Sequence, residues 1–163
     1  MGSVTASTIW PALSISDEVK KLVDHFFTLV DLKSDDSGER IAKEVFTKDG
    51  IFILADGTFK GTAADELRAY EEISTSRKTA WSSITFRHHE VLKVYVDASG
   101  TDFILIGRLR METVEGEQAA RQFVAKVEIE QTRSGFRLRQ YRIIDPVAKD
   151  SPPYFPIKQL IGG

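Results

Sequence analysis

Four long strand-like segments in the second half of the sequence constrain the fold most. They cover residues 84–96, 102–113, 120–131 and 136–145, and short turns separate them. Connections of this length join antiparallel neighbours, whereas parallel strands need a long crossover. In the third segment, apolar residues at every second position from Phe123 to Ile129 alternate with mostly polar ones, as in a strand with one buried face. The sequence therefore predicts a four-stranded antiparallel meander.

The last of these segments breaks the alternation. Its apolar positions change parity, from Phe136 and Leu138 to Tyr141 and Ile143. A β-bulge near Gln140 produces such a change, because it adds one residue to one strand of a pair. Bulges also bend a strand, so we expect a curved sheet.

Helical signals dominate the first half. Ser14 and Ser16 both suit the N-cap of a first helix that ends near Lys33. Apolar residues follow at helical spacing: Val19, Leu22, Val23, Phe26, Phe27 and Val30. A second, short helix is expected around residues 41–46, ending before Asp49. A small hairpin over residues 51–60 and a third helix from Thr62 to about Ser76 complete this half.

Both ends of the chain lie outside these patterns. Residues 1–13 show no periodicity, which predicts a flexible N-terminal arm, with Trp10 touching the body of a domain over residues 14–145. Residues 146–163 contain Pro152, Pro153 and Pro156, which preclude a helix or a central strand. This tail is too apolar to stay in solvent, so we expect it to pack on its own domain, to cover a pocket, or to contact a partner subunit.

Composition limits the classes of function. The 163 residues suffice for one domain, and 22 basic against 24 acidic residues give a net charge of −2, too little positive field to hold nucleic acid. The longest apolar runs have only strand length, so no membrane span is expected. The N-terminus lacks a signal peptide, and Ala6 stands where the myristoylation pattern requires Ser or Thr. We expect a soluble, cytoplasmic protein, and without cysteine it has no thiol chemistry.

Three stretches carry a resemblance to a known family: HFFTLVDLKSDDSGERIAKEVFTKDGIF at residues 25–52, DGTFKG at 56–61, and FRHHEVLKVYV at 86–96. With the order of elements, they resemble the SnoaL-like branch of the nuclear transport factor two-like superfamily, and its fungal members most. The resemblance implies an α+β fold, in which a cone-shaped, curved antiparallel sheet wraps around N-terminal helices and leaves an internal pocket. The superfamily includes cyclases, dehydratases, isomerases and catalytically inert binding modules.

The adjacent histidines His88 and His89 are the first candidates for chemistry. Strand neighbours face opposite sides, so they cannot both face one pocket, and they are a poor chelate for a metal. Continuing the alternation back from Leu92 places His88 inward, whereas the pattern of the relatives, with a bulge before Val94, places His89 and Val91 inward. Either histidine could act as a general acid or base. Alternatively, either could be a structural residue whose side chain forms a hydrogen bond with a neighbouring strand.

Other candidates come from the same segments. Asp145 occupies a place similar to the acidic residue that SnoaL-like cyclases use for acid–base work, although an Asp before Pro146 is also typical of a turn. Tyr141 or Arg108 would hold a developing oxyanion, unless Arg108 lies on the solvated face. Three aromatic residues are expected to form pocket walls or plain core: Trp81, Phe52 and Phe26. Asp31 is interpreted as solvated or capping.

These residues suggest a cofactor-independent enzyme of secondary metabolism, without a metal. It would cyclise, isomerise or dehydrate a mostly apolar, polyketide-like or terpenoid-like molecule. The alternative is a non-catalytic ligand-binding or dimerisation module of the same fold. An enzyme should keep polar groups facing into the pocket, whereas a module should have only apolar ones. The resemblance also implies a homodimer formed through the outer face of the sheet.

Overall fold

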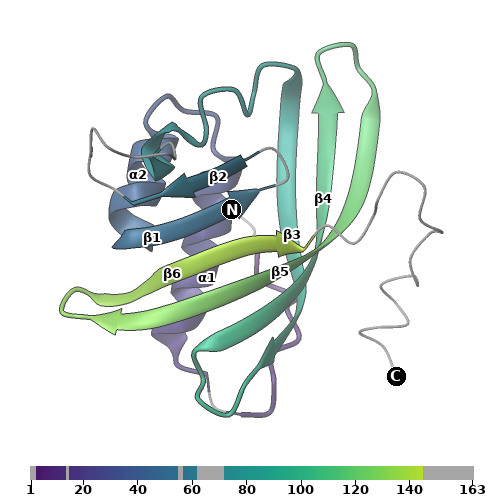
Figure 1. Ribbon diagram of the computed structural model, residues 1–163. Coiled ribbons are helices and arrows are strands. Elements are labelled where there is room, and N and C mark those ends of the chain that lie inside the picture. Colours follow the sequence, from purple (N-terminus) through teal and green to yellow (C-terminus); the bar gives the residue numbers. More distant parts are fainter. Residues whose placement is uncertain (1–2, 14, 55–56, 62–71, 145–163) are drawn as a thin grey trace.

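The computed structural model describes residues 3–13, 15–54, 57–61 and 72–144. Its elements in chain order are α1 (Asp17–Asp31), α2 (Ser37–Arg40), a π-helical turn (Ile41–Val45), β1 (Phe46–Leu54), β2 (Gly57–Lys60), a 3₁₀ turn (Ile73–Thr75), β3 (Ile84–Val96), β4 (Asp102–Thr113), β5 (Gln118–Thr132) and β6 (Gly135–Ile144). Figure 1 shows their arrangement.

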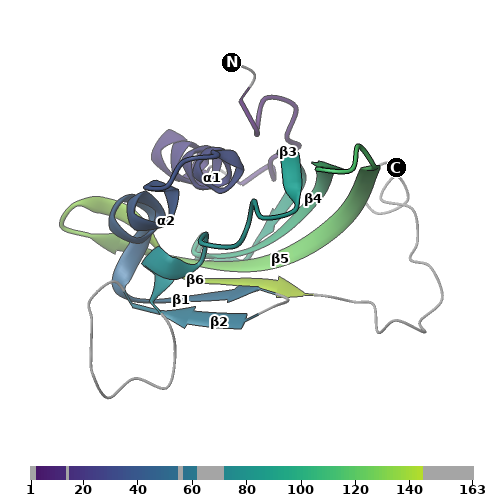
Figure 2. The same ribbon diagram turned by 90° about the horizontal axis from the view of Figure 1, so that it is seen from above.

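The strands form one six-stranded sheet in the order β2-β1-β6-β5-β4-β3. All neighbouring pairs are antiparallel except β1 and β6, which run parallel. The sheet is open and strongly curved, and α1 and α2 lie in its hollow (Figure 2). The α+β fold and the antiparallel meander predicted from the sequence are therefore confirmed, and the hollow beside α1 is where a site can form.

Register shifts interrupt the pairing of β3 with β4 and of β5 with β6, and two of them set which side chains face inward. In β6, Gln140 pairs with Glu128 and Leu138 with Ile129, so Arg139 is the additional residue, as the parity of the sequence predicted. In β3, Val91 pairs with Gly107 and Lys93 with Ile106, so Leu92 is the additional residue. Because of this second bulge, Val91 and Val94 both point into the core, although they are three residues apart.

Helix α1 supplies one wall of the core. Ser16 caps it, because its side-chain oxygen accepts a hydrogen bond from the backbone N–H of Val19 at 3.3 Å. Its buried stripe packs against the aromatic side chains of the sheet: Phe26 lies 4.8 Å from Tyr141 and 5.7 Å from Phe52, measured between ring centroids. Burying each side chain of this size contributes about 1.5–3 kcal/mol, so this aromatic cluster anchors the helix in the hollow.

The segment between α2 and β1 differs from the prediction. The expected second helix lies at residues 37–45, and the strand begins at Phe46 rather than at Ile51. Phe46 pairs with Leu138 and Ile51 with Gln140, with an irregularity between them. Asp49 and Gly50 thus lie within an irregular strand and do not end a helix. The expected third helix falls largely on residues 62–71, outside the described residues, as do the C-terminal tail and Asp145.

The N-terminal segment, which the sequence predicted as a flexible arm, lies along β3. Ile9 forms a parallel bridge with Lys93, and its N–H donates to the carbonyl of Leu92 at 2.9 Å. Val4 is buried. The segment therefore adds partners to the strand that would otherwise end the sheet.

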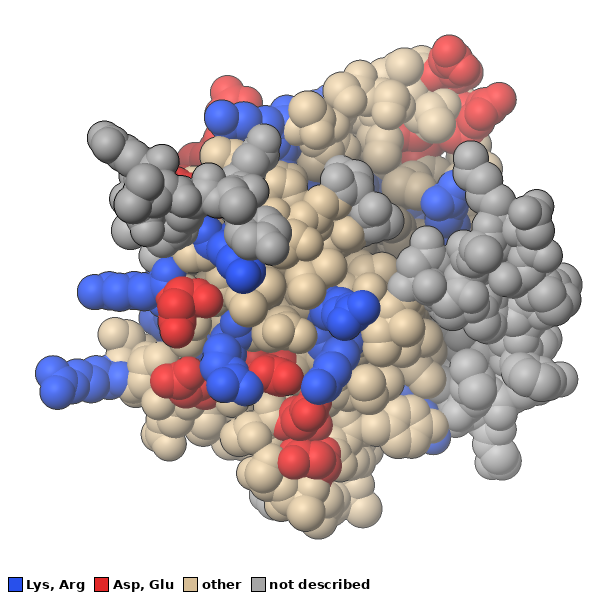
Figure 3. All heavy atoms as spheres, viewed as in Figure 1, with Lys and Arg blue, Asp and Glu red and all other residues tan. Residues whose placement is uncertain are grey.

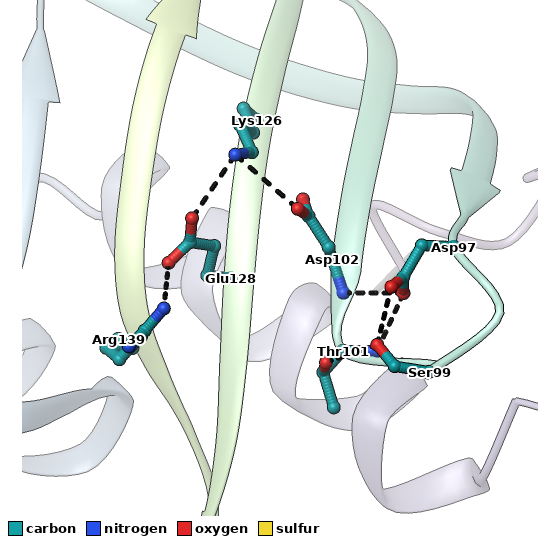
Figure 4. A network of polar contacts seen from close by, with 7 residues as sticks. All are labelled: Asp97, Ser99, Thr101, Asp102, Lys126, Glu128 and Arg139. Carbon is teal, nitrogen blue, oxygen red and sulfur yellow. Dashed lines mark hydrogen bonds and ion pairs between the residues drawn. The ribbon is translucent and has the colours of Figure 1, made fainter.

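The outer face of the sheet is polar. Figure 3 shows basic and acidic side chains intermingled over it. Lys126 lies 3.2 Å from Glu128 and 3.4 Å from Asp102, and Arg139 lies 2.6 Å from the other oxygen of Glu128 (Figure 4). Beside this network, hydrogen bonds from the turn that joins β3 to β4 lower the pKa of Asp97 to about 2. Because these charged side chains pair with one another on the outer, solvated face, a buried site is expected on the concave face.

Candidate active site

A cavity of about 440 Å³ lies between α1 and the concave face of the sheet. Its walls are mostly apolar and aromatic: Phe26, Phe27, Val30, Phe52, Leu54, Ile84, Leu109, Met111, Phe123, Ile143 and Ile144. Polar side chains also line it: Ser76, Arg77, Thr79, Ser83, Arg87, His89, Arg121, Gln122 and Tyr141. Its volume lies within the range of small-molecule sites, about 300–1,000 Å³.

His89 reaches the cavity from β3 and is paired with Asp31 from α1. The Nδ1 atom of His89 lies 2.5 Å from one carboxylate oxygen of Asp31. The backbone N–H of His89 donates to the other oxygen at 2.6 Å. Because the carboxylate accepts both bonds, the proton of a neutral imidazole belongs on Nδ1, and Nε2 keeps its lone pair. In this arrangement the Asp31 carboxylate orients the His89 imidazole, whose Nε2 can act as a base.

Asp31 stands where helix electrostatics disfavours it. It is the last residue of α1, and the last turn of this helix contains no basic residue. A carboxylate at the negative end of a helix dipole costs about 0.3–1 kcal/mol near the surface, and the side chain of Asp31 is only 11% exposed. A residue that breaks a local rule and is compensated by a specific partner often marks a functional site.

Burial sets the protonation state of His89. Desolvation lowers the pKa of this imidazole, and the nearby charges of Arg87 and Arg77 lower it further. Asp31 raises the pKa through its hydrogen bond and its charge, but burial is the largest effect. The imidazole is therefore neutral at pH 7 and ready to accept a proton.

Aromatic side chains fix the position of the imidazole. The ring centroid of Phe27 lies 5.3 Å from that of His89, and the centroid of Phe123 lies 5.5 Å from it. Phe123 can lie against the sheet because its neighbour on β4 is Gly107, where a Cβ atom would overlap its ring. On the other side, Tyr141 is 2% exposed, and burial raises the pKa of its hydroxyl. Tyr141 is therefore a proton donor in hydrogen bonds.

Four of the residues singled out in the sequence line this cavity: His89, Tyr141, Phe52 and Phe26. His88 does not, and its side chain is 33% exposed with Nδ1 3.8 Å from Asp31. The bulge at Leu92 explains why His89 faces inward, as the pattern of the relatives suggested.

Two residues singled out in the sequence lie elsewhere. Arg108 is on the outer face, 47% exposed and 2.6 Å from Glu90, so its expected contact with a substrate in the pocket is not met. Trp81 is not among the lining residues, and the ammonium group of Lys33 lies 5.8 Å from its ring centroid.

The structure adds residues that sequence reasoning missed. The sequence alone indicates a solvated or capping role for Asp31 and does not single out Arg77. Arg87 had a usable signal, since it lies two positions before His89 and therefore on the same face of β3. The sequence signal for Asp31 was weak, because it consisted only of the unfavourable position of a carboxylate at the C-terminal end of a helix.

No group of three or more His, Cys, Asp or Glu side chains among the described residues could hold a metal ion. None of the helices in the described part of the chain is long and apolar enough to cross a membrane.

No family model matches the chain, and no curated protein sequence does. Solved structures do match. A candidate aromatic ring hydroxylase from Novosphingobium aromaticivorans superposes with a TM-score of 0.62 at 16% identity, over 80% of this chain and 88% of that one. A candidate scytalone dehydratase from the same organism gives a TM-score of 0.62 at 9% identity, over 84% and 87%. A type 2 hexachlorocyclohexane dehydrochlorinase (LinA) gives 0.58 at 17% identity, over 85% and 93%.

These neighbours are proteins of the nuclear transport factor two-like fold. This chain has that fold. At such low identity the likeness extends to the fold and not to an activity. The nuclear transport factor two-like fold explains the cavity, since a curved sheet around a helix leaves a concave interior.

Proposed function

We propose that this protein is a cofactor-independent enzyme that moves a proton to or from a carbon atom of a mostly apolar small molecule. The observation that carries the proposal is the Asp31–His89 pair, buried at the wall of the cavity. The polar groups that face inward fit an enzyme better than a closed binding module.

The chemistry follows from the roles of three side chains. Nε2 of His89 takes a proton from a carbon atom of the substrate, and the electron pair of the broken C–H bond moves into the substrate. Asp31 stabilises the imidazolium ion that forms. The hydroxyl of Tyr141 donates a hydrogen bond to the oxygen on which negative charge develops.

Two outcomes complete the reaction. A leaving group departs on the neighbouring carbon, which gives an elimination, or the imidazolium returns its proton to another atom, which gives an isomerisation or closes a ring. The names of two structural neighbours, a dehydratase and a dehydrochlorinase, denote eliminations and support the first outcome. The fungal resemblance in the sequence supports a role in secondary metabolism, with a polyketide-like or terpenoid-like substrate.

The test is a comparison of the two adjacent histidines. Purified protein without added cofactor is incubated in deuterated water with a panel of small molecules that carry an acidic C–H bond, and mass spectrometry detects elimination, isomerisation or deuterium uptake. His89→Gln should lower the rate on an active compound about 10²–10⁴-fold, the usual contribution of a positioned base. His88→Gln is the matched control, because His88 lies outside the cavity, and it should retain most of the activity.

Equal rates in the wild type and the His89→Gln variant would contradict the proposal. Binding without any turnover across the panel would favour a ligand-binding module.

A further inference from the structure

We propose that Phe123 is a specificity-determining residue, on whose ring a planar, unsaturated part of the substrate stacks beside His89. This inference rests on the proposed function and adds a choice between the two classes of substrate named there. It favours a flat, polyketide-like ring system over the saturated, puckered rings of a terpenoid-like molecule.

Phe123 differs from the other phenylalanines of the cavity in its exposure. Four phenylalanines among the described residues line this space. Three of them are only 1–2% exposed, so core neighbours already cover their rings: Phe26, Phe27 and Phe52. Phe123 is half-buried and packs at the margin of the core. Part of its ring surface is therefore open to a ligand.

The position of Phe123 along β5 explains this exposure. Ala125 and Val127 follow it at every second position and therefore share its face of the strand. Both are buried, at 0% and 1% exposed. Phe123 thus marks the point on β5 at which the packed core ends and the cavity begins.

Gly107 holds the ring of Phe123 against the sheet. The two residues are partners in the pairing of β4 with β5. A Cβ atom at position 107 would lie 2.2 Å from Cζ and 2.4 Å from Cε1 of Phe123, so the tip of the ring occupies the space of a side chain. The ring therefore lies close to the backbone of β4, and it borders the cavity without filling it.

The base has a defined orientation relative to this ring. The ring centroids of His89 and Phe123 are 5.5 Å apart, and their planes make an angle of 74°. Phe27 packs against both rings, with centroid distances of 5.3 Å to His89 and 5.8 Å to Phe123. A flat ligand ring that stacks parallel to Phe123 therefore stands nearly perpendicular to the imidazole.

This angle suits the removal of a proton from carbon. The lone pair of Nε2 lies in the plane of the imidazole, so it can be directed at the face of such a ligand. Beside a carbonyl group, the C–H bond that breaks must stand perpendicular to the carbonyl plane, because only then does its electron pair enter the π system. Stacking on Phe123 would hold the substrate in the orientation that the reaction needs.

A saturated ring gains less from Phe123. It is puckered, so it makes fewer close contacts with a flat surface, and it has no π face for offset stacking. Offset aromatic pairs gain free energy beyond that of burial, which corresponds to about two- to twelvefold in affinity. Flat and puckered ligands of the same skeleton should differ by about this factor.

Two methyl ketones are matched probes for this difference. 2-Acetylnaphthalene is flat, and 2-acetyl-trans-decalin has the same carbon skeleton with saturated rings. Calorimetry measures the affinity of both, and NMR records the ring protons of Phe123. In the wild type we expect 2-acetylnaphthalene to bind about two- to twelvefold more tightly and to shift these ring protons upfield, as a stacked aromatic ring does.

Two variants and a control assign the preference to Phe123. Phe123→Leu removes the ring and should bind both probes equally. Gly107→Ala keeps the ring but displaces it, and should also reduce the preference. Phe86→Leu is the control, because Phe86 is 48% exposed and lies outside this cavity, and it should retain the wild-type preference.

The inference would be overturned by equal affinities in the wild type, by no binding of 2-acetylnaphthalene, or by a preference that Phe123→Leu leaves unchanged. If a variant does not fold, the upfield shift in the wild type still tests the stacking, and its absence would refute it.

The outcomes also separate this inference from the proposed function. Turnover that depends on His89 but is equally fast on saturated ring substrates would refute the stacking and leave the proposed function intact. A preference for the flat probe that depends on Phe123, without turnover of any compound, would refute the enzyme and retain Phe123 as the ligand-binding surface of a non-catalytic module.

Discussion

Replacing Asp31 by asparagine should reverse the tautomer of His89. The carboxylate accepts two hydrogen bonds, from Nδ1 and from the backbone N–H of His89. An asparagine has one accepting oxygen, and the backbone N–H cannot change its role. The oxygen must therefore face the backbone, and the NH₂ group then faces Nδ1, which has to become an acceptor. The proton moves to Nε2, the atom that should act as the base.

The size of the effect differs between activity and stability. Loss of a positioned base lowers the rate by about 10²–10⁴-fold. A hydrogen bond to a charged group contributes about 1.5–3 kcal/mol, whereas removing a carboxylate from the end of α1 returns about 0.3–1 kcal/mol. The free energy of unfolding should thus fall by about 0.5–2.7 kcal/mol, which lowers Tm by about 1–11 °C in a domain of this size.

Nitrogen-15 NMR of the imidazole rings measures the tautomer directly and needs no substrate. The chain has three histidines, so His25→Gln and His88→Gln variants suffice to assign the signals. We expect a proton on Nδ1 of His89 in the wild type and on Nε2 in Asp31→Asn, with Asp49→Asn as an unaffected control. If the wild type carries the proton on Nε2, or if Asp31→Asn keeps it on Nδ1, the reasoning about the pair is refuted.

Three further predictions concern stability and packing. Because burial lowers the folded-state pKa of His89, the unfolded chain takes up a proton there first; stability from this residue is present above about pH 6.5 and declines below it. Urea unfolding at pH 5 and 7 should show a smaller pH dependence in His89→Gln, and an unchanged one would contradict this. Gly107→Ala should cost about 1–3 kcal/mol and displace the ring of Phe123, visible in its NMR signals, since the new methyl group overlaps that ring and lies 2.8 Å from the carbonyl of Glu90. Leu105→Ala should cost about 2–5 kcal/mol because Leu105 is buried, whereas Arg108→Ala should cost less than about 1 kcal/mol; similar losses in both would refute the assignment of faces.

Patterns among neighbouring residues predicted the elements whose conformation depends on their own sequence. Alternation and short turns were enough for the meander, and the change of parity before Tyr141 was enough for the bulge in β6. The start of β1 was misjudged because Asp49-Gly50 is typical of a turn, and only pairing with β6, some 90 residues along the chain, keeps it within a strand.

The site also depends on residues that lie far apart in the sequence. Asp31 and His89 are 58 residues apart, and neither the helix nor the strand reveals the other. The facing of His89 depends on one additional residue, Leu92, so that a strict alternation would have chosen His88. Arg108 directly follows the apolar run at residues 103–107, but on a half-solvated strand a charged residue in this position more often marks the outer face.

Amide hydrogen exchange in β3, the strand that carries His89, can report whether the N-terminal segment is docked. The amide protons of Val91 and Val94 are bonded to the carbonyls of Val4 and Ile9, at 3.2 and 3.1 Å. These amides sit on the last strand of the sheet and exchange slowly with deuterated water only while residues 3–13 remain docked. Their exchange rates therefore report how often the segment releases, and hence how steadily the backbone two residues from His89 is held. A chain that lacks the first 13 residues would lose this protection and would present a bare strand edge to other molecules.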